Sequence, residues 1–112
     1  LNRKKIYSEI NQYLEIHIKE PISVQDICLR FGVSKATLSK VFHENADRSF
    51  HNYLTVLRVE KAKEIMQSRT EYFIKDVAQE VGYEDQFYFS RIFKSVTGIS
   101  PSDFLLKCSE KI

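Results

Sequence analysis

The stretch of sequence that decides the fold covers residues 77–93 and reads VAQEVGYEDQFYFSRIF. A weaker copy of this stretch occurs earlier in the chain, at residues 27–42. The offset between the copies is 50 residues up to the glycine and 51 residues after it, because the second copy has one more residue in its turn. Such self-similarity indicates that one supersecondary unit is used twice. The paired positions are Ile27 with Val77, Cys28 with Ala78, Phe31 with Val81, Gly32 with Gly82, and Leu38-Ser39-Lys40-Val41-Phe42 with Phe89-Ser90-Arg91-Ile92-Phe93.

Each copy reads as a helix, a glycine turn and a second helix. A small residue, Cys28 or Ala78, lies four positions before the glycine, where two helices crossing at about 90–120° leave room only for a small side chain. The residue after the glycine, Val33 or Tyr83, is expected to fill the inside of the corner. One such corner is common in α-helical proteins. Two copies at matched spacing favour a pair of helix-turn-helix units, the motif that places its second helix in the DNA major groove.

The apolar spacing elsewhere is also helical and shows no sustained β-alternation, so we expect an all-α fold. Pro21 is expected to end a first helix, because the residue before a proline disfavours helical angles. Ser23, Ser34 and Ser49 precede periodic apolar segments and are the expected N-caps of the next three helices. Gly32 can end the second helix in the left-handed conformation.

A long helix is expected over residues 50–68, between the two copies. We therefore divide the chain into a first helix-turn-helix subdomain at 1–49, a linker helix at 50–68 and a second subdomain at 69–112. The side chains expected to face inward are Leu38, Val41 and Phe42 in the third helix, and Tyr53, Leu54, Leu57, Ala62, Ile65 and Met66 in the long helix.

Composition allows one domain or two small subdomains, because the chain has 112 residues and a net charge of only +2. The charge is unevenly distributed. Residues 27–43 contain no acidic side chain, whereas residues 71–94 contain three basic and five acidic side chains. No apolar run approaches the ~18 residues of a membrane span. No basic amphipathic helix of the membrane-surface type is sustained.

The sequence offers no constellation typical of an enzyme. The three histidines lie in different segments, and no phosphate-binding glycine loop occurs. Cys28 and Cys108 are too far apart in sequence for a metal clip, so we expect no cofactor, no metal and a reducing cytoplasm. The chain begins at Leu1 rather than Met, which suggests a fragment of a longer protein.

Nearly the whole chain resembles the AraC/XylS family of transcription regulators. In the second copy the resemblance rests on Ile74, Val77-Ala78, Val81-Gly82-Tyr83-Glu84-Asp85, Tyr88-Phe89-Ser90-Arg91-Ile92-Phe93-Lys94, Gly98 and Ser100-Pro101. In the first copy it rests on Ile22, Gly32, Ser34, Leu38, Phe42, Ser49-Phe50, Tyr53-Leu54, Arg58 and Ala62. The resemblance implies a seven-helix domain that binds double-stranded DNA, usually C-terminal to a sensing or dimerisation domain. It also implies action in the bacterial cytoplasm, at the nucleoid.

Three features depart from the family pattern. Asp47 stands where the first copy usually has the glycine that matches Gly98, so a left-handed turn there must be adopted by Asp47 or Asn45 with some strain. Cys28 replaces the usual alanine, which is tolerable at a small buried position. The run 70–73 offers no clear cap before the fifth helix.

The candidate base-reading residues follow from the faces of the two second helices. If Leu38 and Phe42 face the core, the opposite face has the spacing that a helix in a major groove must present. Arg91 is the strongest candidate, since its planar fork matches the two acceptors of guanine. The full set is Ala36, Ser39, Lys40, Gln86, Phe87 and Arg91, and the family resemblance places base contacts at the same positions.

Candidate phosphate contacts lie beside these faces. They are Ser34, Lys35, Arg58 and Lys94. Three alternatives stay open. Arg58 could make an internal ion pair, and Lys40 or Arg91 could be solubilising charges. Phe87 and Tyr88 could also be partly buried packing residues, Tyr88 next to Ile92.

The length of the long helix bears on the binding mode. About 18–19 helical residues span roughly 27 Å, whereas successive major grooves on one face of B-DNA recur about every 34 Å. We therefore favour bent DNA with both reading helices engaged, and the alternative is insertion of one helix only. A rival function is a protein-interaction module, in which the acidic second unit docks an RNA polymerase subunit or the sensing domain.

Overall fold

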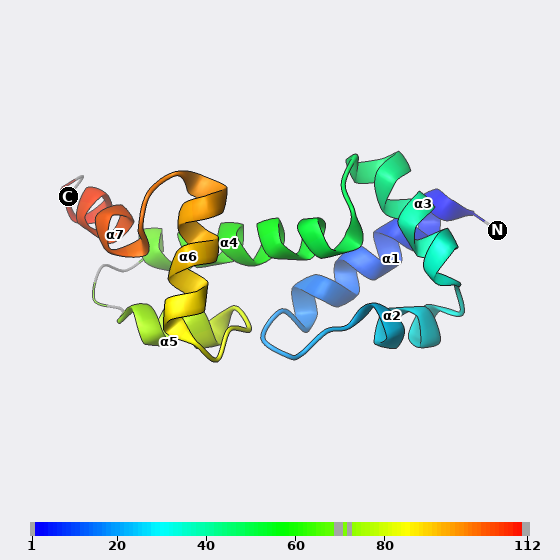
Figure 1. Cartoon of the computed structure of the whole chain (residues 1–112), viewed down its shortest axis with the longest axis horizontal. Coiled ribbons are helices and arrows are strands. Elements are labelled where there is room, and N and C mark those ends of the chain that lie inside the picture. The colour runs from blue at the N-terminus through cyan, green and yellow to red at the C-terminus, as the bar shows by residue number, and fades with distance from the viewer. Residues whose placement is uncertain (1, 69–70, 72, 111–112) are drawn as a thin grey trace. The chain divides into compact units, whose positions relative to one another are not determined.

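The computed structural model describes residues 2–68, 71 and 73–110. This part of the chain forms seven α-helices and no strand, which confirms the all-α fold class (Figure 1). The helices are α1 (Arg3–Ile16), α2 (Val24–Phe31), α3 (Lys35–Ala46), α4 (Phe50–Ser68), α5 (Ile74–Glu80), α6 (Gln86–Thr97) and α7 (Pro101–Ser109). Within the described ranges, none of these helices is both long and apolar enough to cross a membrane.

The chain divides into two compact units, Leu1–Thr55 and Val56–Ile112. The division falls inside α4, so this helix contributes its first turns to one unit and its remainder to the other. The sequence-based boundaries at 49/50 and 68/69, which set the long helix apart from both units, stay a prediction.

The caps of the first unit lie where the sequence predicts them. The Ser23 hydroxyl accepts a hydrogen bond from the Asp26 amide, and the Ser34 hydroxyl accepts one from the Thr37 amide, both at 3.1 Å. Gly32 ends α2 with φ at 65°, in the left-handed region that glycine adopts without steric cost. These caps fix where α3 begins and therefore which of its faces points inward.

The second unit repeats this arrangement with different residues. Asp85 takes the place of Ser34, and its carboxylate accepts hydrogen bonds from the Phe87 and Tyr88 amides. Both α3 and α6 have 12 residues, and each ends at a left-handed residue. In α6 this is Gly98, with φ at 89°, whereas in α3 it is Asp47, with φ at 53°. The strained turn expected at this departure from the family pattern is therefore confirmed at Asp47.

Two helix ends need comment. The first helix ends at Ile16, before the predicted stop at Pro21, because the backbone leaves the helical region at His17 and the Glu20 amide donates to the His17 carbonyl at 2.9 Å in a turn. A turn then leads to the proline. The fifth helix begins after Phe73 without a side-chain cap, as the run 70–73 suggests, although residues 70 and 72 lie outside the described part.

An aromatic cluster holds α3 in the first unit. The fully buried Phe42 ring lies 5.1–5.3 Å, between centroids, from the rings of Tyr7, Phe50 and Tyr53. The Tyr53 hydroxyl donates to the Asn11 side chain and accepts from Tyr7, and burial raises the pKa of Tyr53 well above its usual range. Because α1 and α4 both supply rings to this cluster, α3 is fixed by its inner face. The predicted inner residues Leu38, Val41 and Phe42 are all buried.

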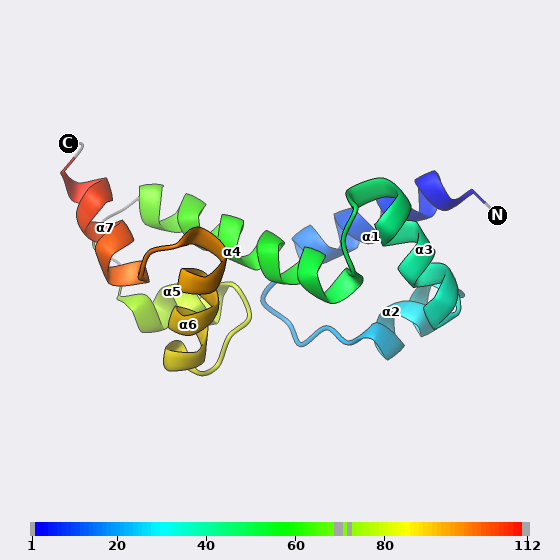
Figure 2. The same ribbon diagram turned by 45° about the horizontal axis from the view of Figure 1, so that its top comes forward.

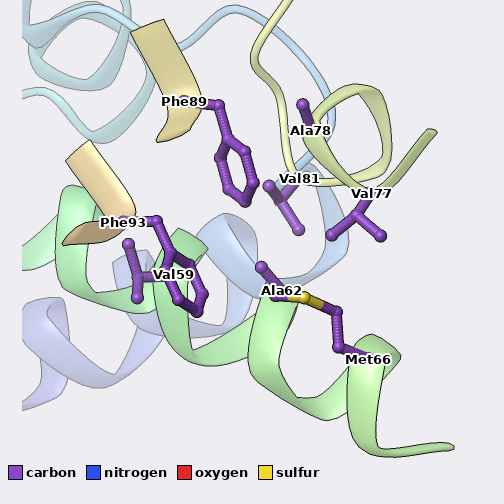
Figure 3. Packing of buried hydrophobic residues seen from close by; sticks show 8 residues of the cluster. All are labelled: Val59, Ala62, Met66, Val77, Ala78, Val81, Phe89 and Phe93. Atoms are coloured by element: carbon purple, nitrogen blue, oxygen red, sulfur yellow. The ribbon is translucent and has the colours of Figure 1, made fainter. Parts of the chain in front are cut away.

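In the second unit, α6 lies against α5 (Figure 2) and is also held by the buried apolar side chains of its inner face. Figure 3 shows Phe89 and Phe93 of α6 pointing at side chains of α4, of α5 and of Val81, the residue that caps the end of α5. These partners are fully buried, and they are Val59, Ala62, Met66, Val77, Ala78 and Val81. Fully burying a phenylalanine side chain contributes roughly 1.5–3 kcal/mol, so the two rings determine the rotation of α6 about its axis.

The burial of the long helix and of Cys28 differs in part from expectation. Val59 is fully buried although it was not among the expected inner residues, because α5 and α6 pack on its side of α4. Tyr53 and Ile65 face inward as expected, since Tyr53 packs on Phe42 and Ile65 packs against the core of the second unit, but both are half-buried, as is Leu57. Cys28 is also only half-buried, unlike its fully buried counterpart Ala78.

Candidate nucleic-acid interface

The outer face of α3 is open to solvent. Opposite the buried Leu38 and Phe42, the exposed residues are Lys35, Ala36, Ser39, Lys40 and His43. This face contains all three residues of α3 that were predicted to read bases, and it places them one turn or less apart along one helix. The predicted orientation of α3 is therefore confirmed, whereas the role of each side chain stays a prediction.

The outer face of α3 is also electropositive at its start. The first turn carries Lys35 and no acidic residue, and the backbone amides at a helix N-terminus add partial positive charge. The nearest acidic residue along α3 is Glu44, and Arg3 holds its carboxylate at 2.9 Å. Across residues 2–68, 71 and 73–110, Lys35 and Lys40 have no carboxylate within ion-pair distance. Both ammonium groups are thus available to an anion.

Ser34 is engaged in capping. Its hydroxyl accepts from the Thr37 amide and donates to the Thr37 hydroxyl at 3.1 Å. A phosphate at this position would meet the backbone amides of the helix start and the neighbouring Lys35 rather than a free serine hydroxyl.

The outer face of α6 has a different chemistry. Phe87 is 69% exposed, and Arg91 and Lys94 are also exposed. Ser90 and Gln86 are half-buried, and the Ser90 hydroxyl donates to the Gln86 carbonyl at 2.9 Å. Phe87, Arg91 and Lys94 therefore face outward as predicted, whereas Gln86 and Ser90 lie at the border of this face and their roles stay a prediction. Because most of the Phe87 side chain is exposed, the alternative that it packs against the described residues is not supported.

Arg91 contacts an aromatic ring that the sequence pattern did not connect with it. Its guanidinium carbon lies 5.8 Å from the centroid of the Tyr88 ring, which is 43% exposed. The Tyr88 ring in turn lies 5.9 Å from the Tyr83 ring, and Tyr83 packs on the buried Phe89 at 5.6 Å. The signal available in the sequence was the i, i+3 spacing of Tyr88 and Arg91, which places them on one side of a helix.

Arg58 is half-buried, and its guanidinium carbon lies 5.6 Å from the centroid of the Tyr83 ring. Burial lowers the pKa of the Arg58 guanidinium, and the Tyr83 side chain acts in the opposite direction. The guanidinium is therefore engaged within the second unit, where it contacts the Tyr83 ring, and the internal ion-pair alternative stays open. Its contact with a phosphate stays a prediction.

The sequence pattern of the family described as "Helix-turn-helix domain" matches residues 27–107, and that of "Helix-turn-helix domain of resolvase" matches residues 3–45. The arabinose operon regulatory protein of Escherichia coli K12 is 33% identical over 105 residues, which cover 93% of this chain and 36% of that protein. The chain thus spans about a third of the length of the arabinose operon regulators that it matches.

Solved structures show the same architecture. The C-terminal domain of AraT, a response regulator from Geobacillus stearothermophilus, has a TM-score of 0.85 and 32% identity over 91% of this chain and 84% of that chain. The DNA-binding domain of the global transcriptional factor AdpA, solved in complex with a target DNA, has a TM-score of 0.87 over 94% of each chain. At 19% identity, this second likeness concerns the fold alone. Taken with the duplicated corner and its two outward faces, the matches show that the chain belongs to the AraC family of transcription regulators, as a helix-turn-helix DNA-binding domain of that family.

Proposed function

We propose that this domain binds double-stranded DNA in a sequence-specific manner, by laying the outer faces of α3 and α6 into major grooves. The observation that carries the proposal is that the same solvent-exposed helix face occurs twice. Two helices of 12 residues occupy equivalent places in a duplicated corner, and each presents polar or apolar side chains to solvent directly opposite its buried stripe. A major groove of B-DNA admits an α-helix presented in this way.

The first reading face would combine small side chains with one long cation. Lys40 can reach the O6 or N7 atom of guanine, and the Ala36 methyl group can contact the methyl group of thymine. Ser39 can donate or accept with little base selectivity. This face would therefore approach the base edges closely.

The second reading face would be more selective. Arg91 offers two parallel donors to guanine, and Gln86 offers the donor and acceptor that adenine requires. Phe87, which is 69% exposed, suits a thymine methyl group. The three side chains lie within the first six residues of α6, a length that covers two or three successive base pairs.

Contacts to phosphates would set the register of each helix. Lys35 and Lys94 are exposed cations beside the reading faces, and the N-terminus of α3 at Ser34 adds backbone amides next to Lys35. Arg58 would contribute a further phosphate contact beside the Tyr83 ring, which its guanidinium contacts.

We also propose partners beyond DNA. The arabinose operon regulators are about three times as long as the segment matched here, which supports a sensing or dimerisation domain acting together with this one. RNA polymerase subunits are further proposed partners, and the bacterial cytoplasm, at the nucleoid, is the proposed place of action. The proposal assigns no catalytic role and no metal or cofactor to the domain.

The test is selection of bound sequences from a randomised DNA pool, followed by binding titrations at several salt concentrations. We expect one preferred site with two boxes about one helical turn apart, and an affinity that falls log-linearly with salt. If the bound DNA shows no preferred sequence, or if binding is independent of salt, the proposal is refuted and a protein-interaction module is favoured. Bending of the DNA is measured by comparing the gel mobility of complexes on fragments that carry the site at different positions. We expect bending if both helices insert.

A further inference from the structure

Tyr88 and Arg91 form a pair on the outer face of α6. They are three residues apart, so they lie on the same side of the helix, one turn from each other. The guanidinium carbon of Arg91 lies 5.8 Å from the ring centroid of Tyr88, within the ~6 Å at which a cation is attracted to an aromatic face. Because the ring is 43% exposed, this contact stands at the surface and not in the core.

The Tyr88 ring is itself supported from below. Tyr83 lies 5.9 Å from it with an interplanar angle of 56°, and the Tyr83 ring packs at 5.6 Å on Phe89, which is fully buried. On the other side of Tyr83, the guanidinium of Arg58 lies 5.6 Å from the ring centroid. We call Arg58, Tyr83, Tyr88 and Arg91 the cation–aromatic row. The row connects the packed interior of the second unit to the reading face of α6.

The internal repeat shows that this row is particular to the second copy. The positions equivalent to Tyr88 and Arg91 in α3 hold Thr37 and Lys40. The aromatic ring and the arginine are thus present together in one copy and absent together from the other. A lysine reads DNA as a point charge, whereas an arginine reads guanine with a planar fork that must be oriented. An aromatic ring that fixes the plane of the side-chain head group is therefore useful for the arginine guanidinium and not for the lysine ammonium.

We infer that Tyr88 is a positioning residue for Arg91, holding its guanidinium in the orientation in which both donors meet the O6 and N7 atoms of one guanine. This inference rests on the proposed function. An unsupported arginine loses rotamer freedom when it docks, and a contact that already restricts the side chain reduces that cost. The consequence is specific: Tyr88 contributes to discrimination at the base pair read by Arg91 and contributes little at other base pairs.

A double-mutant cycle tests the inference. The variants are Tyr88→Leu, Arg91→Ala and the double variant, and the DNA is the site selected by the wild-type domain. The measured quantity is the dissociation constant for the site carrying 7-deazaguanine, at the guanine whose recognition Arg91→Ala abolishes, divided by the dissociation constant for the unmodified site. We expect Tyr88→Leu to lower this ratio about two- to fivefold, the range of an exposed cation–aromatic contact. In the Arg91→Ala background, Tyr88→Leu should leave the ratio unchanged.

Two matched variants separate positioning from other roles. Tyr88→Phe keeps the ring and should retain the wild-type ratio, and Tyr88→Gln removes the ring while keeping a polar side chain, so it should behave like Tyr88→Leu. Thermal melts of each variant show whether it is folded under the binding conditions. The inference is overturned if Tyr88→Leu and Tyr88→Gln leave the ratio unchanged, or if they lower it equally with and without Arg91. A wild-type domain that selects no site would instead refute the proposed function itself.

Discussion

Replacement of Arg91 by alanine tests the second reading face most directly. The side chain is exposed, its one ring contact is with Tyr88, and no carboxylate of the described residues lies within ion-pair distance of it. Its removal should therefore change the free energy of unfolding by no more than about 0.5 kcal/mol. A bidentate contact to guanine contributes about 1–3 kcal/mol of binding free energy. The dissociation constant for the selected site should rise roughly 5- to 160-fold.

Arg91→Lys distinguishes the fork from the charge. Lysine keeps the positive charge at this position but presents its donors from a single nitrogen. We expect Arg91→Lys to retain the wild-type slope of log affinity against log salt and to weaken, without abolishing, the preference for guanine. Arg91→Ala should lose both the preference and, where the guanidinium also neutralises a nearby phosphate, part of the slope.

The assay is competition between the selected site and its three variants at one base pair, followed by fluorescence anisotropy. Lys94→Ala is the matched control, because Lys94 is an exposed cation on the same helix and is expected to contact phosphate. It should weaken all four sequences equally. If Arg91→Ala and Lys94→Ala give the same profile across the four sequences, the reasoning that assigns base reading to Arg91 is wrong.

Three further changes probe phosphate contact, backbone strain and packing. Lys35→Ala should weaken binding to every sequence and reduce the slope of log affinity against log salt by about 0.9. The control Lys4→Ala, on α1, should leave this slope unchanged. Equal slopes for the two variants in salt titrations would contradict a phosphate contact of Lys35. At Asp47, with φ at 53°, thermal melts should rank Gly above Asp and Asp above Ala, because a left-handed alanine costs about 1 kcal/mol; a more stable alanine variant would exclude the strain. Ala78→Phe overpacks a fully buried corner and should lower the free energy of unfolding, measured with denaturant, by about 1–3 kcal/mol or more. Cys28→Phe, at the half-buried equivalent position, should lower it less. The reverse order would count against the corner geometry.

Much of the fold could be predicted because local chemistry and the internal repeat agree. Ser23 and Ser34 cap helices where their hydroxyls reach an amide three residues on, and this depends only on neighbours in sequence. The repeat then transferred each assignment to the second copy. The equal lengths of α3 and α6, and their left-handed ends at Asp47 and Gly98, follow from that transfer.

The errors arose where packing between helices decides the outcome. Val59 belongs to the core because α5 and α6 approach its side of α4, which no periodicity within α4 reveals. Cys28 is half-buried, although its spacing from the glycine equals that of Ala78, because the two corners are packed differently. In the same way, the Tyr83 and Tyr88 contact depends on how the turn folds back on α6, and a sequence pattern gives only the possibility of it.

The two reading faces differ in a manner that follows from their chemistry. On α3, Lys35 and Lys40 accompany small neighbours within an acid-free segment, so this face gains mainly from electrostatic attraction to phosphates and close approach. On α6, the surroundings are acidic, and the cation Arg91 is accompanied by aromatic rings. A face with less long-range attraction must gain its binding energy from directional contacts to bases. Substitutions on α3 should therefore act mostly on overall affinity and its salt dependence, and substitutions on α6 mostly on which sequence is preferred.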